Sequence, residues 1–315
     1  MDAGDASSAD AGPDATVDSG DIGCDGPPGL YQSESCTALA DGVRPFQPAY
    51  ALWTDGASKE RFVYLPPGTQ IDASDPDGWV FPVGTRLYKT FSLGGVRLET
   101  RLLEKTREGV GYTNWEMRAF LWNASQDAVF ESDGELVEDV LGTRHDVPSR
   151  DMCRDCHSAN RDGVNGFSAL QLGHGGPGIT LDDLNREGQL APPLASGEVS
   201  LPGDEATQAA LGYLHANCAH CHQGDGSGSV TGLLLRVDVG LETPEETLAY
   251  RSAVDVPGNW VAVGARLRIA SGDPEASTII RRMRSREPAI QMPPLGTEIV
   301  DSAGLELVRQ WIEGI

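Results

Sequence analysis

Two copies of the pentapeptide Cys-x-x-Cys-His are the residues that most clearly predict chemistry in this chain. They are Cys153-Arg154-Asp155-Cys156-His157 and Cys218-Ala219-His220-Cys221-His222. This spacing is typical of c-type haem attachment. The two thiols bond to one porphyrin as thioethers, and the adjacent imidazole is placed to ligate the iron. The sequence therefore predicts two covalently bound haem c groups, with His157 and His222 as iron ligands.

Two other interpretations of these cysteines remain open. A pair of cysteines at this spacing can be half of a zinc site, which would require both motifs to converge on one metal ion. A redox-active dithiol also uses Cys-x-x-Cys, although it does not need the histidine that follows. The doubled pentapeptide, in a chain with six cysteines, favours haem.

A methionine near the C-terminus is the predicted sixth ligand of the second haem. Met292 lies in Gln291-Met292-Pro293-Pro294-Leu295-Gly296, a segment stiffened by proline. A thioether is a soft, neutral ligand that favours ferrous iron, as in Met/His-ligated cytochromes. Met292 is thus the expected partner of His222, although methionines also serve commonly as core residues.

The sixth ligand of the first haem has no such candidate. No Met-Pro-Pro segment follows His157, so the choice stays open among several side chains: His145, His174, His215, Met117 and Met283. For each of these residues, an exposed position or one packed in a core is the default expectation.

The C-terminal part contains the signals of three helices around the second motif. Asp204 and Glu205 precede Leu211 and Leu214 at helical spacing, and Asp273 precedes Pro274. A last helix is predicted from about Asp301. The stretch 204–315 resembles a class I cytochrome c domain, in its Asn217-to-His222 motif and its Gln291-to-Pro294 segment. That resemblance implies an all-α domain, interrupted by an insertion at about 231–272.

Residues from about 30 to 150 have the pattern of an antiparallel β domain. Short alternating runs are separated by turn signals such as Gly94-Gly95. The predicted strands include Arg61 to Leu65, Arg86 to Phe91, Val96 to Leu102 and Trp115 to Asn123. The first haem motif follows this region directly.

Several segments together resemble an uncharacterised family of bacterial dihaem c-type cytochromes. They are Tyr50-Ala51-Leu52-Trp53-Thr54-Asp55-Gly56, Phe81-Pro82-Val83-Gly84-Thr85, Glu99-Thr100-Arg101-Leu102-Leu103, Pro148-Ser149-Arg150 and Gln291-Met292-Pro293-Pro294. The β region is also similar to cytochromes c-prime of the beta type, through the run from Phe81 to Thr85. That second similarity implies a five-coordinate haem at His157 with an open distal face.

Composition limits the compartment and the partners. The net charge of −23 argues against binding to nucleic acid or anionic membranes and suits redox protein partners. No apolar run is long enough to span a bilayer. Because c-type haem is attached outside the cytoplasm, we expect a periplasmic or cell-surface protein whose precursor carried an export signal, with a lipid anchor as an open alternative for its attachment.

The expected organisation is therefore α+β, with an antiparallel β domain ending in a haem motif and then an all-α cytochrome c domain. We expect an acidic, disordered tether at 1–28, a β-rich domain at 29–165, a linker at 166–203 and the helical domain at 204–315. Cys24 and Cys36 are expected to form a disulfide, the alternative being two free thiols.

Three functions are compatible with these features. In the first, both haems only pass electrons between redox partners. In the second, the chain is an enzyme that acts on peroxide or nitric oxide at an open haem bound by His157, and the distal pocket decides between the two. In the third, the β domain binds a partner and the haem is structural. The sequence favours electron transfer.

Overall fold

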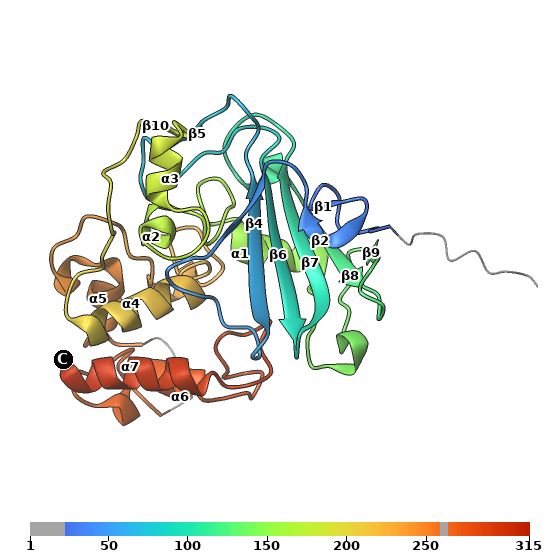
Figure 1. The fold of residues 1–315 in the computed structure, drawn as a ribbon. Helices are drawn as coiled ribbons and strands as arrows, with labels where there is room; N and C mark the ends of the chain where they lie inside the picture. Colours follow the sequence, from blue (N-terminus) through green and yellow to red (C-terminus); the bar gives the residue numbers. More distant parts are fainter. Residues whose placement is uncertain (1–22, 259–263) are drawn as a thin grey trace, which may run out of the picture.

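The computed structural model describes residues 23–258 and 264–315. A six-stranded antiparallel sheet stands at its centre, and helices pack beside and below it (Figure 1). The predicted tether lies mostly outside these residues, as does part of the predicted insertion. No helix in the described ranges is long and apolar enough to cross a membrane.

The central sheet has the order β3-β4-β6-β7-β8-β9. Its strands are β3 (Val43–Phe46), β4 (Ser58–Tyr64), β6 (Arg86–Leu93), β7 (Val96–Lys105), β8 (Trp115–Trp122) and β9 (Val129–Glu131). Smaller pairs are formed by β1 (Tyr31–Gln32) with β2 (Ser35–Leu39), and by β5 (Ile71–Asp72) with β10 (Leu190–Ala191).

The predicted strands are confirmed as β4, β6, β7 and β8. Gly94 and Gly95 form the two-residue turn between β6 and β7, and both have a positive φ, as a tight hairpin requires. Alternation along the strands gives the sheet two faces. Phe62, Tyr88 and Leu102 pack on one face, and Val63, Leu87 and Leu103 on the other. The predicted disulfide between Cys24 and Cys36 is also present.

Seven α-helices lie in the described part of the chain. They are α1 (Arg150–His157), α2 (Ala169–Leu172), α3 (Leu181–Arg186), α4 (Glu205–Asn217), α5 (Leu248–Ala253), α6 (Thr278–Met283) and α7 (Ser302–Gly314). The predicted starts of α4 and α7 are confirmed, because Asp204 and Asp301 each accept a hydrogen bond from the first turn. Asp273 caps a short 3₁₀ turn, Pro274–Ala276, just before α6.

The prediction of an all-α cytochrome c domain at 204–315 is wrong. The described structure is mostly β, with 25% of its residues helical. In this region α5 and α6 have six residues each, and isolated β-bridges join Val254 to Ile269 and Leu267 to Ser277. The segments between α4 and α7 contain many prolines and glycines, which disfavour helix, and much of the chain there is irregular.

The two largest hydrophobic cores of the described residues adjoin each other, because Val199 and Val239 pack against both. The first lies between the sheet and α2 and α3, and contains Phe81, Phe167 and Leu184. The second surrounds α4 and α7 and contains Leu211, Leu214 and Trp311. Helices α4 and α7 approach closely because Gly304 of α7 leaves room for the Tyr213 ring.

Gly304→Ala should therefore destabilise the fold. A Cβ atom at position 304 would lie far closer to the Tyr213 ring than van der Waals contact allows, so α7 or Tyr213 must shift. We expect a loss of about 1–3 kcal/mol in the free energy of unfolding, measured by urea denaturation. Gly314→Ala, at the far end of the same helix, is the control, because a Cβ there meets nothing within 4 Å. Equal stability of the two variants would contradict this packing.

Candidate functional site

The first Cys-x-x-Cys-His motif forms the last turns of α1. Ser149 caps this helix by accepting a hydrogen bond from the Met152 amide. The Nδ1 atom of His157 lies 2.6 Å from the Gly163 carbonyl oxygen. Gly163 has a positive φ, and a Cβ atom there would lie 2.8 Å from the Tyr112 backbone. Only glycine can therefore hold this carbonyl against the histidine without strain.

The second motif follows α4 and continues it as a turn. Cys218 is the C-terminal cap of α4, and the His222 amide donates to the Cys218 carbonyl at 2.9 Å. The Nδ1 atom of His222 lies 3.3 Å from the Leu233 carbonyl oxygen. His222 is buried, and its own carbonyl accepts a hydrogen bond from the Leu235 amide.

Both motif histidines are thus arranged in the same way. A hydrogen bond from Nδ1–H to a backbone carbonyl fixes the ring and leaves Nε2 as the atom that can bind a metal. Burial lowers the pKa of His157 to about 4 and also lowers that of His222. Both rings are therefore neutral at pH 7, which is the form that ligates iron.

A cavity of about 880 Å³ joins the two motifs. Mainly apolar side chains line it, and α1, β7, β8, α4 and α6 all contribute. Every predicted site residue lies on its wall: Cys153, Cys156, His157, Cys218, Cys221, His222 and Met292. The four motif cysteines are free thiols. The fold thus brings together residues that are up to 139 positions apart, from 153 to 292.

The loop that carries Met292 is held by backbone hydrogen bonds to charged side chains. Arg286 donates to the Met283 and Met292 carbonyl oxygens and to the Thr297 hydroxyl. On the other side of the loop, the Asp55 carboxylate accepts from the amides of Glu298 and Ile299 at 2.8–3.0 Å. The position of Met292 therefore depends on Asp55, from the N-terminal half of the chain, and on Arg286, from the C-terminal half.

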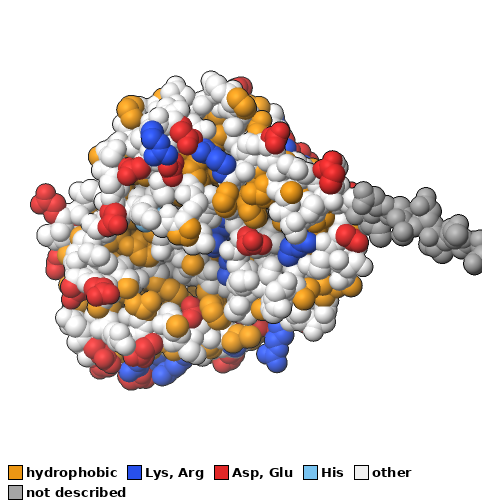
Figure 2. Space-filling model, in the orientation of Figure 1, with side chains coloured by type: hydrophobic (Ala, Val, Ile, Leu, Met, Phe, Trp, Pro, Cys, Tyr) orange, Lys and Arg blue, Asp and Glu red, His pale blue; other side chains and the backbone are white. Residues whose placement is uncertain are grey.

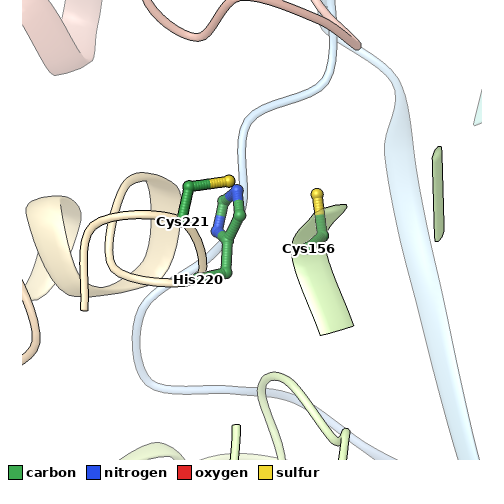
Figure 3. Close-up of side chains that lie close together, drawn as sticks. All are labelled: Cys156, His220 and Cys221. Atoms are coloured by element: carbon green, nitrogen blue, oxygen red, sulfur yellow. The ribbon is translucent and has the colours of Figure 1, made fainter. Parts of the chain in front are cut away.

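The two motifs also approach each other directly. Figure 3 shows His220 and Cys221, in the turn after α4, beside Cys156 of α1. The ligand atoms of these three residues lie within 4.8 Å of one another, and no other such group of three occurs in the described ranges. An interaction between the two thiols lowers the pKa of Cys221 and raises that of Cys156. Cys153 and Cys218 are outside this group, so the four thiols do not converge as a four-cysteine zinc site requires.

The candidate sixth ligands of the first haem fall into two sets. The three histidines are engaged elsewhere: His145 Nε2 with Glu99 at 2.8 Å, His174 Nε2 with the Gln47 carbonyl at 2.7 Å, and His215 Nδ1 with the Val237 amide at 3.2 Å. None of them lines the cavity, whereas Met117 and Met283 do. The geometry therefore favours Met117 and Met283 over the three histidines as candidates for the sixth ligand of the first haem.

Sequence reasoning missed the residues that tie the site together. The Asn217 side chain accepts from the Trp53 amide at 2.7 Å and donates to the Ala51 carbonyl at 3.1 Å. Gln171 accepts from the Tyr50 amide at 2.9 Å. In the sequence, the run from Tyr50 to Gly56 indicates only a family resemblance, and the position of Asn217 directly before Cys218 is the one local sign that this asparagine belongs to the site.

Comparison of the chain with known protein families, curated proteins and solved structures found no match. The resemblances described from the sequence therefore remain predictions, and the function is argued from the site alone.

Because His215 is held as a neutral acceptor, stability should fall in mild acid. Burial lowers its pKa from 6.5 to about 4, so the folded state favours the neutral ring. This stabilisation is complete above pH 6.5 and is lost as the pH falls towards 4, by up to about 1.4 kcal/mol per unit. Urea unfolding of the native chain and of His215→Asn at pH 7 and pH 5 measures the effect.

The asparagine variant is suitable because its side-chain oxygen can accept from Val237 but does not titrate in this range. His157 and His222 contribute equally to both proteins, so their effects cancel in the comparison. We expect the native chain to lose more stability than His215→Asn between the two pH values. An equal loss would show that His215 does not require its neutral form.

Proposed function

We propose that this chain is an exported dihaem c-type cytochrome that transfers electrons between redox partners. The observation that supports it most is that both Cys-x-x-Cys-His motifs open on one apolar cavity, each with its histidine Nδ1 held by a backbone carbonyl. Iron in a thioether-linked haem supplies reversible one-electron chemistry. In this proposal Cys153 and Cys156 hold one haem, and Cys218 and Cys221 hold the other.

The protein residues fit these roles. Nε2 of His157 and of His222 is the free ring nitrogen on each motif, and the thioether of Met292 lies on the same cavity wall. Apolar lining excludes water, which is a means by which proteins tune a haem potential. Cys156 and Cys221 are close neighbours, so groups attached at the two motifs would be held next to each other.

The surface suits a basic or metal-containing redox partner. Acidic side chains are spread over the face shown in Figure 2, and the whole chain carries a net charge of −23. A field of this sign attracts cationic partners and steers their encounter. This is the electrostatic basis for proposing protein partners.

The enzyme alternative depends on the haem at His157. The three histidine candidates for its sixth ligand are bonded elsewhere, which leaves Met117, Met283 or an open coordination position. An open position would permit chemistry on peroxide or nitric oxide, and a methionine would favour electron transfer.

The proposal predicts two covalent haems per chain. The protein would be produced in a host that exports it and attaches c-type haem, and intact mass with a pyridine haemochrome assay would count the groups. Cys153→Ala/Cys156→Ala should retain one haem, and Cys24→Ala/Cys36→Ala, the matched control outside the motifs, should retain two. A native chain that holds zinc and no haem would refute the proposal in favour of the Cys156–His220–Cys221 group.

Met292→Ala should change one haem selectively. Loss of the thioether should lower the midpoint potential of one of two redox transitions and make that haem reactive to carbon monoxide, because the thioether favours ferrous iron and fills the sixth position. Spectroelectrochemistry and the visible spectrum under carbon monoxide measure both effects.

Met152→Leu is the control, because it changes a methionine that lines the same cavity but is not a candidate ligand, and it keeps the apolar volume. Unchanged potentials in Met292→Ala would exclude Met292 as a ligand. A native chain that already binds carbon monoxide, and loses this response in His157→Ala, would favour the enzyme alternative.

A further inference from the structure

Three cations face one another in a row across the central sheet. The strand register places Arg61 of β4 opposite Lys89 of β6, and Lys89 opposite Arg101 of β7. Directly opposed side chains on antiparallel strands have Cβ atoms about 5 Å apart, and like charges there are destabilising. Lys59, two residues before Arg61 on β4, lies on the same face. We call these four residues the cation row.

The cation row has one carboxylate among its described neighbours in the sheet. Glu99 is fully buried and pairs with Arg101 at 2.5 Å, but it also bonds His145 at 2.8 Å. The Lys59 ammonium donates to the Ala57 carbonyl, and Arg61 to the Lys59 carbonyl at 3.5 Å. The Lys89 ammonium has only the Phe91 ring, 5.6 Å away. Three of the four cations therefore lack an ion pair within the described structure.

Burial makes this arrangement costly. Arg61 is 9% exposed, and Lys59 and Lys89 are largely covered by protein. Desolvation, with repulsion from neighbouring cations, lowers the pKa of Lys89 to about 7 and that of Lys59 to about 8. A buried cation is normally paired, so the cation row would be stabilised by an anion.

The cation row also adjoins the first motif. Along β7, the side chain of Arg101 shares a face with that of Leu103, and both residues line the cavity together with Cys153, Cys156 and His157. The charge of Arg101 acts on both cysteines of that motif, and the charge of Lys89 acts on His157. An anion bound to the cation row would therefore lie at the edge of the cavity that serves the first motif.

We propose that Lys59, Arg61, Lys89 and Arg101 form an oxyanion-binding site at the first motif. Arginine forks and lysine ammonium groups are the donors that proteins use for carboxylate and phosphate oxygens. The anion has two possible sources: the carboxylate groups of the porphyrin attached at Cys153 and Cys156, or a small free oxyanion that enters the cavity. The first source rests on the proposed function, and the second does not.

Thermal unfolding with inorganic phosphate, against sodium chloride at equal ionic strength, tests the site. The proteins are the haem-loaded native chain, Cys153→Ala/Cys156→Ala, which lacks the first haem, and each of these with Lys89→Met. Lys59→Met serves in place of any Lys89→Met protein that does not fold. Arg107→Met, which removes an exposed charge outside the cation row, is the control.

Each source gives a distinct pattern. If porphyrin carboxylates occupy the site, Lys89→Met lowers the melting temperature of the loaded chain but raises that of the chain lacking the first haem. Phosphate then stabilises only the latter, by about 2–4 °C for each kcal/mol of binding. If a free oxyanion occupies it, phosphate stabilises the loaded native chain, and Lys89→Met removes this effect.

The site is refuted if phosphate stabilises neither protein and Lys89→Met changes the melting temperature equally in both. The haem content, measured first, separates this failure from failure of the proposed function. A native chain without covalent haem would refute the proposed function, and its response to phosphate would still test the oxyanion site.

Discussion

Hydrogen bonds between residues 50–55 and three distant segments of the chain link the two hydrophobic cores, and several residues that make these bonds also line the cavity. Gln171 and Asn217 bond the backbone at Tyr50, Ala51 and Trp53, and Asp55 bonds the loop that follows Met292. The chain separations of these bonds run from 121 to 244 residues. The same contacts hold the end of α4, where the second motif begins, and the loop that follows Met292.

The second constraint is the distribution of charge. The chain is strongly acidic, yet each of its three lysines is covered by protein to a large degree. Lys105 forms a buried ion pair with Asp162 at 2.5 Å, whereas Lys59 and Lys89 lie on the sheet face near the first motif. On an exposed surface the ammonium groups of Lys59 and Lys89 would be hydrated by water. In this fold the surrounding protein removes much of that hydration. The overall acidity of the chain thus coexists with covered cations at the first motif, where an anionic group would stabilise them.

Local signals predicted the parts of this structure that are determined locally. Alternating side chains identified β4, β6, β7 and β8, and capping aspartates identified the starts of α4 and α7. The all-α C-terminal domain was wrong because the helical signals were extended across a segment whose prolines and glycines leave short helices and irregular chain. The pairing of Asn217 with Trp53, and the approach of His220 to Cys156, depend on tertiary packing. No periodicity or spacing within one segment encodes such contacts, so they required the structure.

The two motifs are held in different ways, and the contact between them is direct. Cys156 and His157 lie in a regular helix near the sheet, whereas Cys221 and His222 lie in a turn beyond α4. The Cys221 thiol donates to the Asp155 carbonyl at 3.5 Å, and Gln223 donates to Asn160 at 3.1 Å, so each motif region bonds the other. These bonds join the two motif regions directly, so they help to set the relative position of the motifs without any residue of the hydrophobic cores. If the motifs carry haems, as proposed, these bonds hold the two attachment sites next to each other.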